Sequence, residues 1–179
     1  MYHVGSRGNN KDVVFFDDHD RRGFLDRLGR TSIRHGWMVL AYCLMGTHYH
    51  VVLQVPIGGL SAGMRLLNGG FSHATNRRYG RSRHLFQNRF FSVEIESDGH
   101  LLEVCRYVVL NPVRAGLCNA PEEWPWSSYR SCAGLDVGPA FLARSRVLGL
   151  FGGDARQAEE AYRAFVREGY AVSDSVTEA

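Results

Sequence analysis

In the amino-terminal half of the chain, segments with the apolar pattern of a strand alternate with segments with the apolar pattern of a helix. Four segments combine apolar, β-branched and aromatic residues in the manner of strands, and they cover residues 2–7, 37–43, 48–55 and 86–96. Two segments between them, residues 18–35 and 61–79, repeat apolar residues at the spacing of an amphipathic helix. The order β-α-β-β-α-β predicts an α+β, ferredoxin-like fold, in which an antiparallel sheet carries both helices on one face.

Local signals support these boundaries. Asp17 and Asp18 provide N-cap chemistry for the first helix, and Gly36 provides its end. Met45 and Gly46 form a tight turn, so the second and third strands are expected to form a hairpin. The residues expected to face the core are Phe24, Leu25, Leu28 and Ile33 in the first helix and Met64, Leu67, Phe71 and Ala74 in the second.

The remaining residues favour helices. One is predicted over residues 98–110 and ends at Asn111, because a residue that precedes proline avoids helical backbone angles. Further helices are predicted over residues 121–131, 141–150 and 154–169, and residues 173–179 are expected to fray. We therefore divide the chain into a domain of residues 1–132 and a helical carboxy-terminal extension of residues 133–179.

Composition narrows the class of protein. The 179 residues suffice for one domain with a proper core. No apolar run approaches the roughly 20 residues that span a bilayer, and the amino terminus lacks the pattern of a signal peptide. The four cysteines lie far apart without a CxxC pair, which is typical of reduced core residues. We expect a cytoplasmic protein without a membrane partner.

Charge is distributed unevenly along the chain. Residues 27–93 contain nine arginines and no acidic residue, whereas the remainder is net −6, because 12 basic residues face 18 acidic ones. Biased genome composition explains an excess of arginine, but it does not explain why the acids are missing from one region. A region of one sign favours a polyanion such as nucleic acid, and the low overall charge of +3 favours a localised groove.

Two histidines begin the third predicted strand. Side chains alternate along a strand, so His48 and His50 share one face, about 6–7 Å apart, and Tyr49 points to the other. Two neutral imidazoles at this spacing can converge on one divalent ion. The alternative is a pair of histidines that only form hydrogen bonds at the edge of a strand.

A tyrosine and a carboxamide share a face of the helix predicted over residues 98–110. Tyr107 and Asn111 are four residues apart. Beside a histidine pair, the amide oxygen could complete the ligand set of Mg²⁺ or Mn²⁺, and the tyrosyl oxygen could attack a phosphodiester and form a phosphotyrosine. Tyr107 could equally be a half-buried helix residue and Asn111 only a helix end.

Several segments together resemble a known family. They are YHVGSRGNN, FFDDHDRRGFLDRL, LMGTHYHVVLQ, LFQNRFFS, YVVLNPVRAGL and WPWSSY, which occur in this order between residues 1 and 132. The chain thereby resembles the HUH single-tyrosine transposases, and within them the REP-associated tyrosine transposases, relatives of small insertion-sequence transposases.

The resemblance implies a function for each of these residues. His48 and His50 would bind the metal, with Asn111 as a polar third ligand, and Tyr107 would form a 5′-phosphotyrosine and leave a free 3′-hydroxyl. The substrate would be single-stranded DNA beside a hairpin such as a palindromic repeat, cleaved and rejoined without ATP at the nucleoid. Charge clustering adds Arg7, Arg65, Arg77, Arg78, Arg81 and Arg89 as candidate DNA contacts.

One feature departs from the family pattern. Gly46 and Thr47 stand where the family commonly has Pro-Asn before the first histidine. The closest alternative is a domesticated nickase that keeps the fold and acts on dispersed repeats without moving itself. An alternative of another class is a non-catalytic regulator that binds hairpin DNA. A metallohydrolase would need acidic ligands, which residues 27–93 do not provide. Both a monomer and a homodimer are compatible with the sequence.

Overall fold

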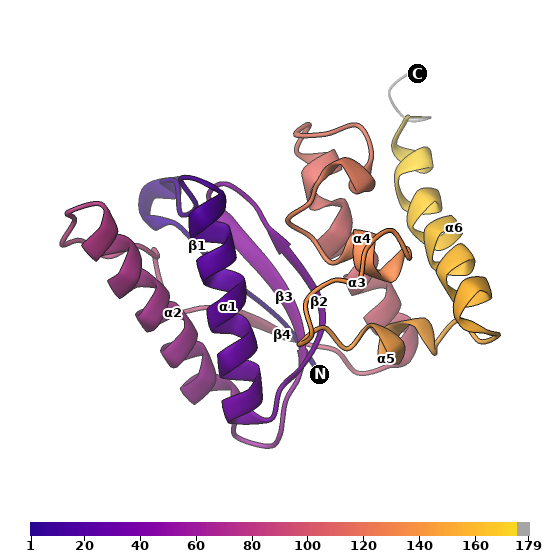
Figure 1. Ribbon diagram of the computed structural model, residues 1–179, viewed down its shortest axis with the longest axis horizontal. Coiled ribbons are helices and arrows are strands. Elements are labelled where there is room, and N and C mark those ends of the chain that lie inside the picture. The colour runs from indigo at the N-terminus through magenta and orange to yellow at the C-terminus, as the bar shows by residue number, and fades with distance from the viewer. Residues whose placement is uncertain (175–179) are drawn as a thin grey trace.

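A four-stranded antiparallel sheet forms the middle layer of the computed structural model, which describes residues 1–174 (Figure 1). The strand order is β2-β3-β1-β4. The strands are β1 (Tyr2–Arg7), β2 (Met38–Leu44), β3 (His48–Gln54) and β4 (Phe91–Glu94). Helices α1 (Asp18–His35) and α2 (Leu60–Arg78) cover one face. The predicted ferredoxin-like arrangement is confirmed.

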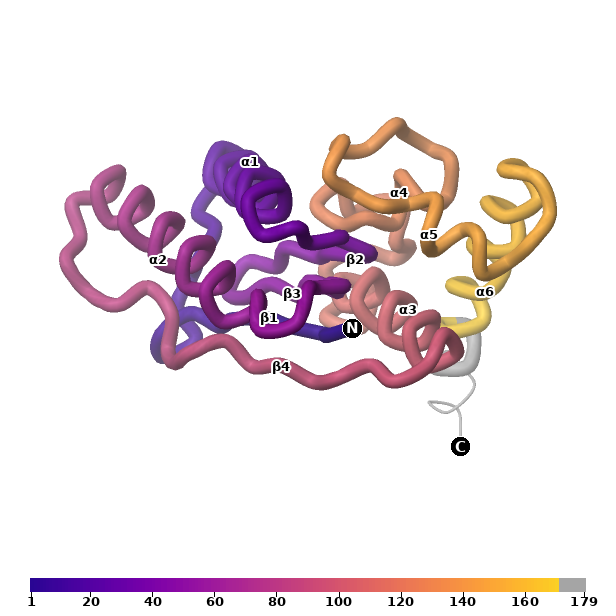
Figure 2. The backbone as a smooth tube through the Cα atoms, turned by 90° about the horizontal axis from the view of Figure 1, so that it is seen from below, coloured from indigo at the N-terminus to yellow at the C-terminus, as the bar shows by residue number. Residues whose placement is uncertain are grey.

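The carboxy-terminal helices lie on the other side of the sheet, where the first of them contacts the strands and the last packs on that first helix (Figure 2). They are α3 (Asp98–Arg114), α4 (Tyr129–Cys132), α5 (Arg144–Leu148) and α6 (Ala155–Asp174), and short 3₁₀ turns occur at Asn9–Lys11 and Pro121–Glu123. The Arg106 guanidinium of α3 stacks 4.3 Å from the ring centroid of Phe165 in α6. Among the described helices, none has the length and apolar character needed to cross a membrane.

The β2-β3 hairpin forms the centre of the core. Met45 N–H donates to the carbonyl of His48 at 2.9 Å and closes the predicted turn. Val51, Val52 and Leu53 are fully buried, because helices cover both faces of the sheet at this strand. Tyr49 is buried as well, with its ring 4.5 Å from that of Phe24 in α1. The two faces of β3 therefore belong to different layers.

Helix α1 has the predicted ends, and Phe24 and Leu28 are buried as predicted. The Asp17 side chain accepts a hydrogen bond from Asp20 N–H, and Gly36 ends the helix with a φ of 64°. The prediction that Ile33 faces the core is wrong, because its side chain is 84% exposed. Nine residues separate it from Phe24, which at 100° per residue places it on the opposite side of the helix. Thr31 and Ser32 are buried instead, and in α2 Thr75 is more buried than Ala74.

Several predicted boundaries in the second half are wrong. β4 is an edge strand of only four residues, all of them exposed, and the segment before it bonds to the end of β1 only through isolated bridges such as Gly8 to Phe86. Residues 121–131 form a 3₁₀ turn and a single helical turn, and residues 141–150 are helical only over Arg144–Leu148. Helix α6 runs past residue 169 to Asp174. The fraying expected for residues 173–179 falls mainly on 175–179, which lie outside the described residues.

Candidate active site

The two histidines of β3 lie on the sheet face that α3 covers. Their ring centroids are 5.1 Å apart, as the two-residue spacing predicts. Antiparallel pairing with β1 sets Gly5 opposite His50 and Arg7 opposite His48. Gly5 is required here, because a Cβ at this position would lie 2.6 Å from the ring of Phe91 in β4. The Phe91 ring can therefore approach the sheet beside His50, with ring centroids 5.8 Å apart.

A third histidine joins the pair from β1. His3 Nε2 lies 3.0 Å from His50 Nδ1 in a buried hydrogen bond. When His50 Nδ1 donates this bond, His50 Nε2 keeps its lone pair for a ligand. The His3 ring also contacts Phe91 and Tyr107, at centroid distances of 5.2 Å and 5.9 Å. His3 thus holds the orientation of His50 and packs beside the tyrosine.

The turn before β3 orients the other histidine. Thr47 Oγ1 lies 3.1 Å from His48 Nδ1, so the second imidazole also keeps Nε2 unused. The turn itself is fixed by backbone hydrogen bonds, from Gly8 N–H to the Thr47 carbonyl and from Val14 N–H to the Gly46 carbonyl. Backbone hydrogen bonds and the Thr47 hydroxyl thus hold the turn before His48 in this chain.

Burial keeps the histidines neutral. Desolvation lowers the pKa of His50 to about 3 and that of His3 to about 4. The pKa of His48 is lowered as well, first by burial and then by the positive charge of Arg7. Neutral imidazoles are the form that binds metal ions, so no proton has to be lost near neutral pH.

Helix α3 places Tyr107 against the histidines. Its ring lies 5.9 Å from that of His50, and its side chain is 43% exposed, so the hydroxyl remains accessible. The prediction that this helix ends before Pro112 is wrong, because α3 continues to Arg114. The added turn places the Arg114 guanidinium 5.2 Å from the Tyr107 ring centroid. A positive charge therefore lies beside the candidate nucleophile.

Asn111 explains why the helix continues through proline. Pro112 has no N–H to donate to the Val108 carbonyl. The Asn111 side-chain nitrogen lies 3.5 Å from that carbonyl and donates to the Tyr107 carbonyl at 2.9 Å. The amide oxygen, the atom that a metal would use, accepts no hydrogen bond within the described part of the chain. Its role as a ligand stays a prediction.

The donor set fits a catalytic metal better than a structural one. Residues 1–174 contain no cluster of three or more His, Cys, Asp or Glu side chains placed to hold a metal ion. His3 is not a third ligand in this arrangement, since its Nε2 is engaged with His50. His48 and His50 provide two nitrogens, which leaves positions for an amide oxygen, water and phosphate oxygens.

The six predicted DNA-binding arginines are not brought together. Arg7 lies at the site, beside His48. Arg65 and Arg89 line a cavity of about 700 Å³ between α2 and residues 86–90, and Arg77 lines a separate groove between α1 and α2. Arg78 forms ion pairs with Asp17 and Asp20, both at 2.6 Å. Arg81 stacks on Phe16, 4.5 Å from the ring centroid. Their contacts with DNA stay predictions.

Sequence reasoning missed His3, Phe91 and Arg114. His3 lies 47 residues from its partner, so no local spacing points to it. The available signal is the period of β1, which places His3, Gly5 and Arg7 on one face. Arg114 was missed because the helix was predicted to end at Asn111, before this residue.

The fold and the site match a known family. Residues 1–111 match the family model described as "Transposase IS200 like", and the chain belongs to this family. A curated relative, the "Putative REP-associated tyrosine transposase" of Haemophilus influenzae, is 24% identical over 121 residues, which cover 62% of this chain and 69% of the relative. The resemblance stated from the sequence is thereby confirmed.

A solved structure has the same fold. It is described as the REP-associated tyrosine transposase bound to a REP hairpin, and it superposes with a TM-score of 0.66 at 17% identity. The match covers 86% of each chain, so it extends beyond the sheet into the carboxy-terminal helices. At this identity the match supports the fold and not the individual residues.

Proposed function

We propose that this transposase cleaves and rejoins single-stranded DNA beside hairpin-forming repeats, with Tyr107 as the nucleophile. The observation that carries the proposal is the position of Tyr107, whose ring lies 5.9 Å from His50 across the junction of sheet and helix. The name of the structural neighbour, a transposase bound to a hairpin, supports the substrate. The exposed aromatic rings of Phe91 and Tyr107 fit unstacked bases better than a duplex.

The cleavage step uses the exposed hydroxyl. The Tyr107 oxygen attacks the phosphorus in line with the 3′-oxygen, a new O–P bond forms, and the bond from phosphorus to the 3′-oxygen breaks. The phenolic proton passes to solvent, and the departing 3′-oxygen takes a proton. The products are a 5′-phosphotyrosine and a free 3′-hydroxyl. Attack by a 3′-hydroxyl on the phosphotyrosine reverses the step, so the strand is rejoined without ATP.

Residues around the tyrosine position the phosphate. The Arg114 guanidinium lies on one side of the Tyr107 ring and Arg7 lies beside His48, so both can contact phosphate oxygens. His48 and His50 would hold Mg²⁺ or Mn²⁺ through Nε2, with Asn111 as the candidate oxygen ligand. A bound divalent ion would supply Lewis-acid polarisation of the scissile phosphate.

A covalent adduct tests the proposal. The protein is incubated with a hairpin oligonucleotide that carries a single-stranded 5′ extension, in Mg²⁺ or Mn²⁺, and run on a denaturing gel. A DNA–protein band is expected, and it should disappear with Tyr107→Phe or with EDTA. Tyr2→Phe is the matched control, because this β1 tyrosine loses only its hydroxyl.

Each other outcome has a distinct meaning. A hairpin that binds without any adduct in the wild-type protein would favour the non-catalytic regulator. An adduct that survives Tyr107→Phe would assign the nucleophile to another residue. An adduct that forms equally well in EDTA would remove the metal from the mechanism.

A further inference from the structure

A hydrogen-bonded cluster lies on the sheet face opposite the histidines, and the proposed function does not account for it. The Tyr49 hydroxyl donates to Asn68 Oδ1 at 2.5 Å, and Asn68 Nδ2 donates to Ser6 Oγ at 2.8 Å. The Tyr49 hydroxyl also lies 3.4 Å from Ser6 Oγ. We call these three residues, which come from β3, α2 and β1, the Tyr49–Asn68–Ser6 cluster.

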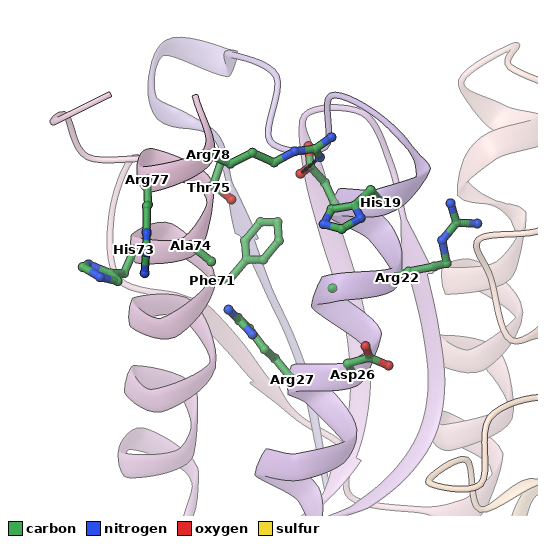
Figure 3. A pocket seen from close by; sticks show the side chains of 12 residues that line it. His19, Arg22, Asp26, Arg27, Phe71, His73, Ala74, Thr75, Arg77 and Arg78 are labelled. Carbon is green, nitrogen blue, oxygen red and sulfur yellow. Dashed lines mark hydrogen bonds and ion pairs between the residues drawn. The ribbon is translucent and has the colours of Figure 1, made fainter. Parts of the chain in front are cut away.

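Asn68 provides a polar link between the helices and the sheet. Within residues 1–174, no other side chain of α1 or α2 forms a hydrogen bond with the four strands. One turn further along α2, Phe71 makes an apolar contact instead. It points toward α1 (Figure 3) and packs edge-on against Phe24, with ring centroids 5.2 Å apart. Because apolar packing is non-directional and hydrogen bonds fix distances and angles, Asn68 sets the position of α2 on the strands.

The cluster holds the end of the β1–β3 ladder. Ser6 pairs with Tyr49, and the two neighbouring pairs contain the histidines. Both strands stop one residue beyond the Ser6–Tyr49 pair, and chain segments at such ends open most easily. A slip of one residue between the strands would move both imidazoles to the wrong face of the sheet. The bonds from Asn68 to both strands oppose this slip at the place where the metal pair lies.

Packing alone does not require the hydroxyl of Tyr49. Its ring is fully buried and lies 4.5 Å from that of Phe24 and 6.0 Å from that of Phe86, surroundings that phenylalanine would fill as well. A buried hydroxyl is unfavourable unless it is bonded, and a fully bonded polar group permits few other arrangements. The hydroxyl therefore contributes a single defined conformation, and not only a packed core.

We propose that Asn68 is a positioning residue for the metal pair, an inference that rests on the proposed function. By binding Tyr49 and Ser6 on one face, it fixes the two strands in the register that presents the histidines to α3 on the other face. Because the histidines are the chain neighbours of Tyr49, a rotation of the backbone at Tyr49 turns both imidazoles. The site is thereby shaped from the far side of the sheet.

Two variants separate positioning from stability. Asn68 is half-buried at the edge of the cavity of about 700 Å³, so leucine can replace it without a clash in the core. Asn68→Leu leaves the Tyr49 hydroxyl without its acceptor, so the melting temperature should fall by roughly 2–6 °C. The double variant Tyr49→Phe/Asn68→Leu removes both partners, so its melting temperature should return to within about 2 °C of wild type. A role in stability alone predicts that the metal site recovers with it.

Mn²⁺ binding in the absence of DNA is the measurement. Free Mn²⁺ is followed through its electron paramagnetic resonance signal during a titration of each protein. Asn68→Leu and the double variant should both bind Mn²⁺ roughly tenfold more weakly than wild type, the lower end of the effect of losing a residue that orients a metal ligand. Asn76→Leu is the matched control, because this α2 asparagine donates to the Arg83 carbonyl and not to the sheet. Its Mn²⁺ affinity should equal that of wild type.

Adduct formation on the hairpin oligonucleotide is measured over the same range of Mn²⁺. The half-saturating Mn²⁺ concentration should rise in parallel with the dissociation constant. A double variant with the Mn²⁺ affinity of wild type would overturn the proposal and leave the chemistry of Tyr107 untouched. A wild-type protein that binds Mn²⁺ but forms no adduct would contradict the proposed chemistry, and weaker Mn²⁺ binding by the double variant would still support the role of Asn68. A wild-type protein that binds no Mn²⁺ would overturn both.

Discussion

His3 connects the two halves of the candidate site. It bonds His50 through Nε2 and packs against Tyr107, so one side chain touches both the metal pair and the nucleophile. Metal-binding histidines usually have their second ring nitrogen held by a partner, which fixes the tautomer and the ring plane. Thr47 provides this partner for His48, and His3 provides it for His50.

Substituting His3 should therefore weaken catalysis without unfolding the protein. His3→Phe keeps a ring of similar size beside Phe91 but removes the hydrogen bond to His50. We expect adduct formation to slow by about 10–100-fold at limiting Mg²⁺, the usual effect of losing such a partner. The measurement is the rate of adduct formation across a Mg²⁺ titration, with His100→Phe, an exposed histidine of α3, as control.

The Mg²⁺ dependence distinguishes positioning from packing. Loss of orientation should shift the titration to higher Mg²⁺, whereas a packing defect should lower the melting temperature and leave the titration midpoint in place. An unchanged midpoint with a lower melting temperature would therefore limit His3 to a packing role.

For single side chains, the sequence predicts those positions that depend on one strand alone. The two-residue period of β3 was enough to place His48 and His50 on one face, and the ring distance of 5.1 Å confirms it. His3 could not be found in the same way, because its position depends on the register between β1 and β3. That register is set by packing of the whole sheet and not by neighbouring residues.

Between elements, an ionic clamp joins the start of α1 to the end of α2. Arg78 pairs with Asp17 and Asp20, and the Tyr79 hydroxyl donates to Asp20 at 2.9 Å. The Arg78 hydrogen bond holds the pKa of Asp17 well below its usual range. The clamp ties the start of α1 to the end of α2. It engages the Arg78 guanidinium, which was predicted to contact DNA.

This clamp predicts an acid-dependent stability. A carboxylate whose pKa is lowered by folding contributes stability above its unfolded pKa of about 4, and the contribution is lost as the pH falls toward the folded value. Asp17→Asn keeps an N-cap but removes the charge, so the melting temperature at pH 7 should fall by roughly 2–4 °C. The difference from wild type should shrink as the pH is lowered below about 4.

Asp26→Asn is the control for this measurement. Asp26 is an exposed carboxylate of α1 that forms no ion pair within the described residues. Its substitution should leave the melting curve and its pH dependence nearly unchanged. A difference between Asp17→Asn and wild type that stays constant from pH 7 to pH 3 would mean that the clamp is not electrostatic.

Element boundaries were predicted well where a local signal decides them. The Asp17 cap and the Gly36 end of α1 are examples, because each acts within one helical turn. The end of α3 was missed because Asn111 partly replaces the donor that Pro112 lacks. Likewise β4 is short because its pairing with β1 stops at Gly5, which the apolar pattern of residues 86–96 does not reveal.

Over the whole molecule, the candidate catalytic helix depends on residues outside the family-matched region. α3 lies between the sheet and α6, and Gly169 of α6 approaches it so closely that a Cβ would lie 2.7 Å from Arg106 Cδ. The Tyr162 ring of α6 is buried and lies 5.9 Å from both Tyr129 and Phe151. The predicted division at residue 132 therefore crosses a shared core.

Because this core is shared, we expect the whole chain to unfold in a single transition. Tyr162→Ala should remove about 3–5 kcal/mol from the free energy of unfolding, the usual cost of deleting a buried aromatic ring. Because Tyr162 packs on α4 as well as on the segment before α6, the loss should lower one cooperative transition and not release the extension alone. Calorimetry of the two proteins checks this, with Arg156→Ala, at an arginine whose side chain is 86% exposed, as control. Two separate transitions, with only the first moved by Tyr162→Ala, would instead make residues 133–179 an independent unit, and Tyr107 would keep forming its adduct after the extension has melted.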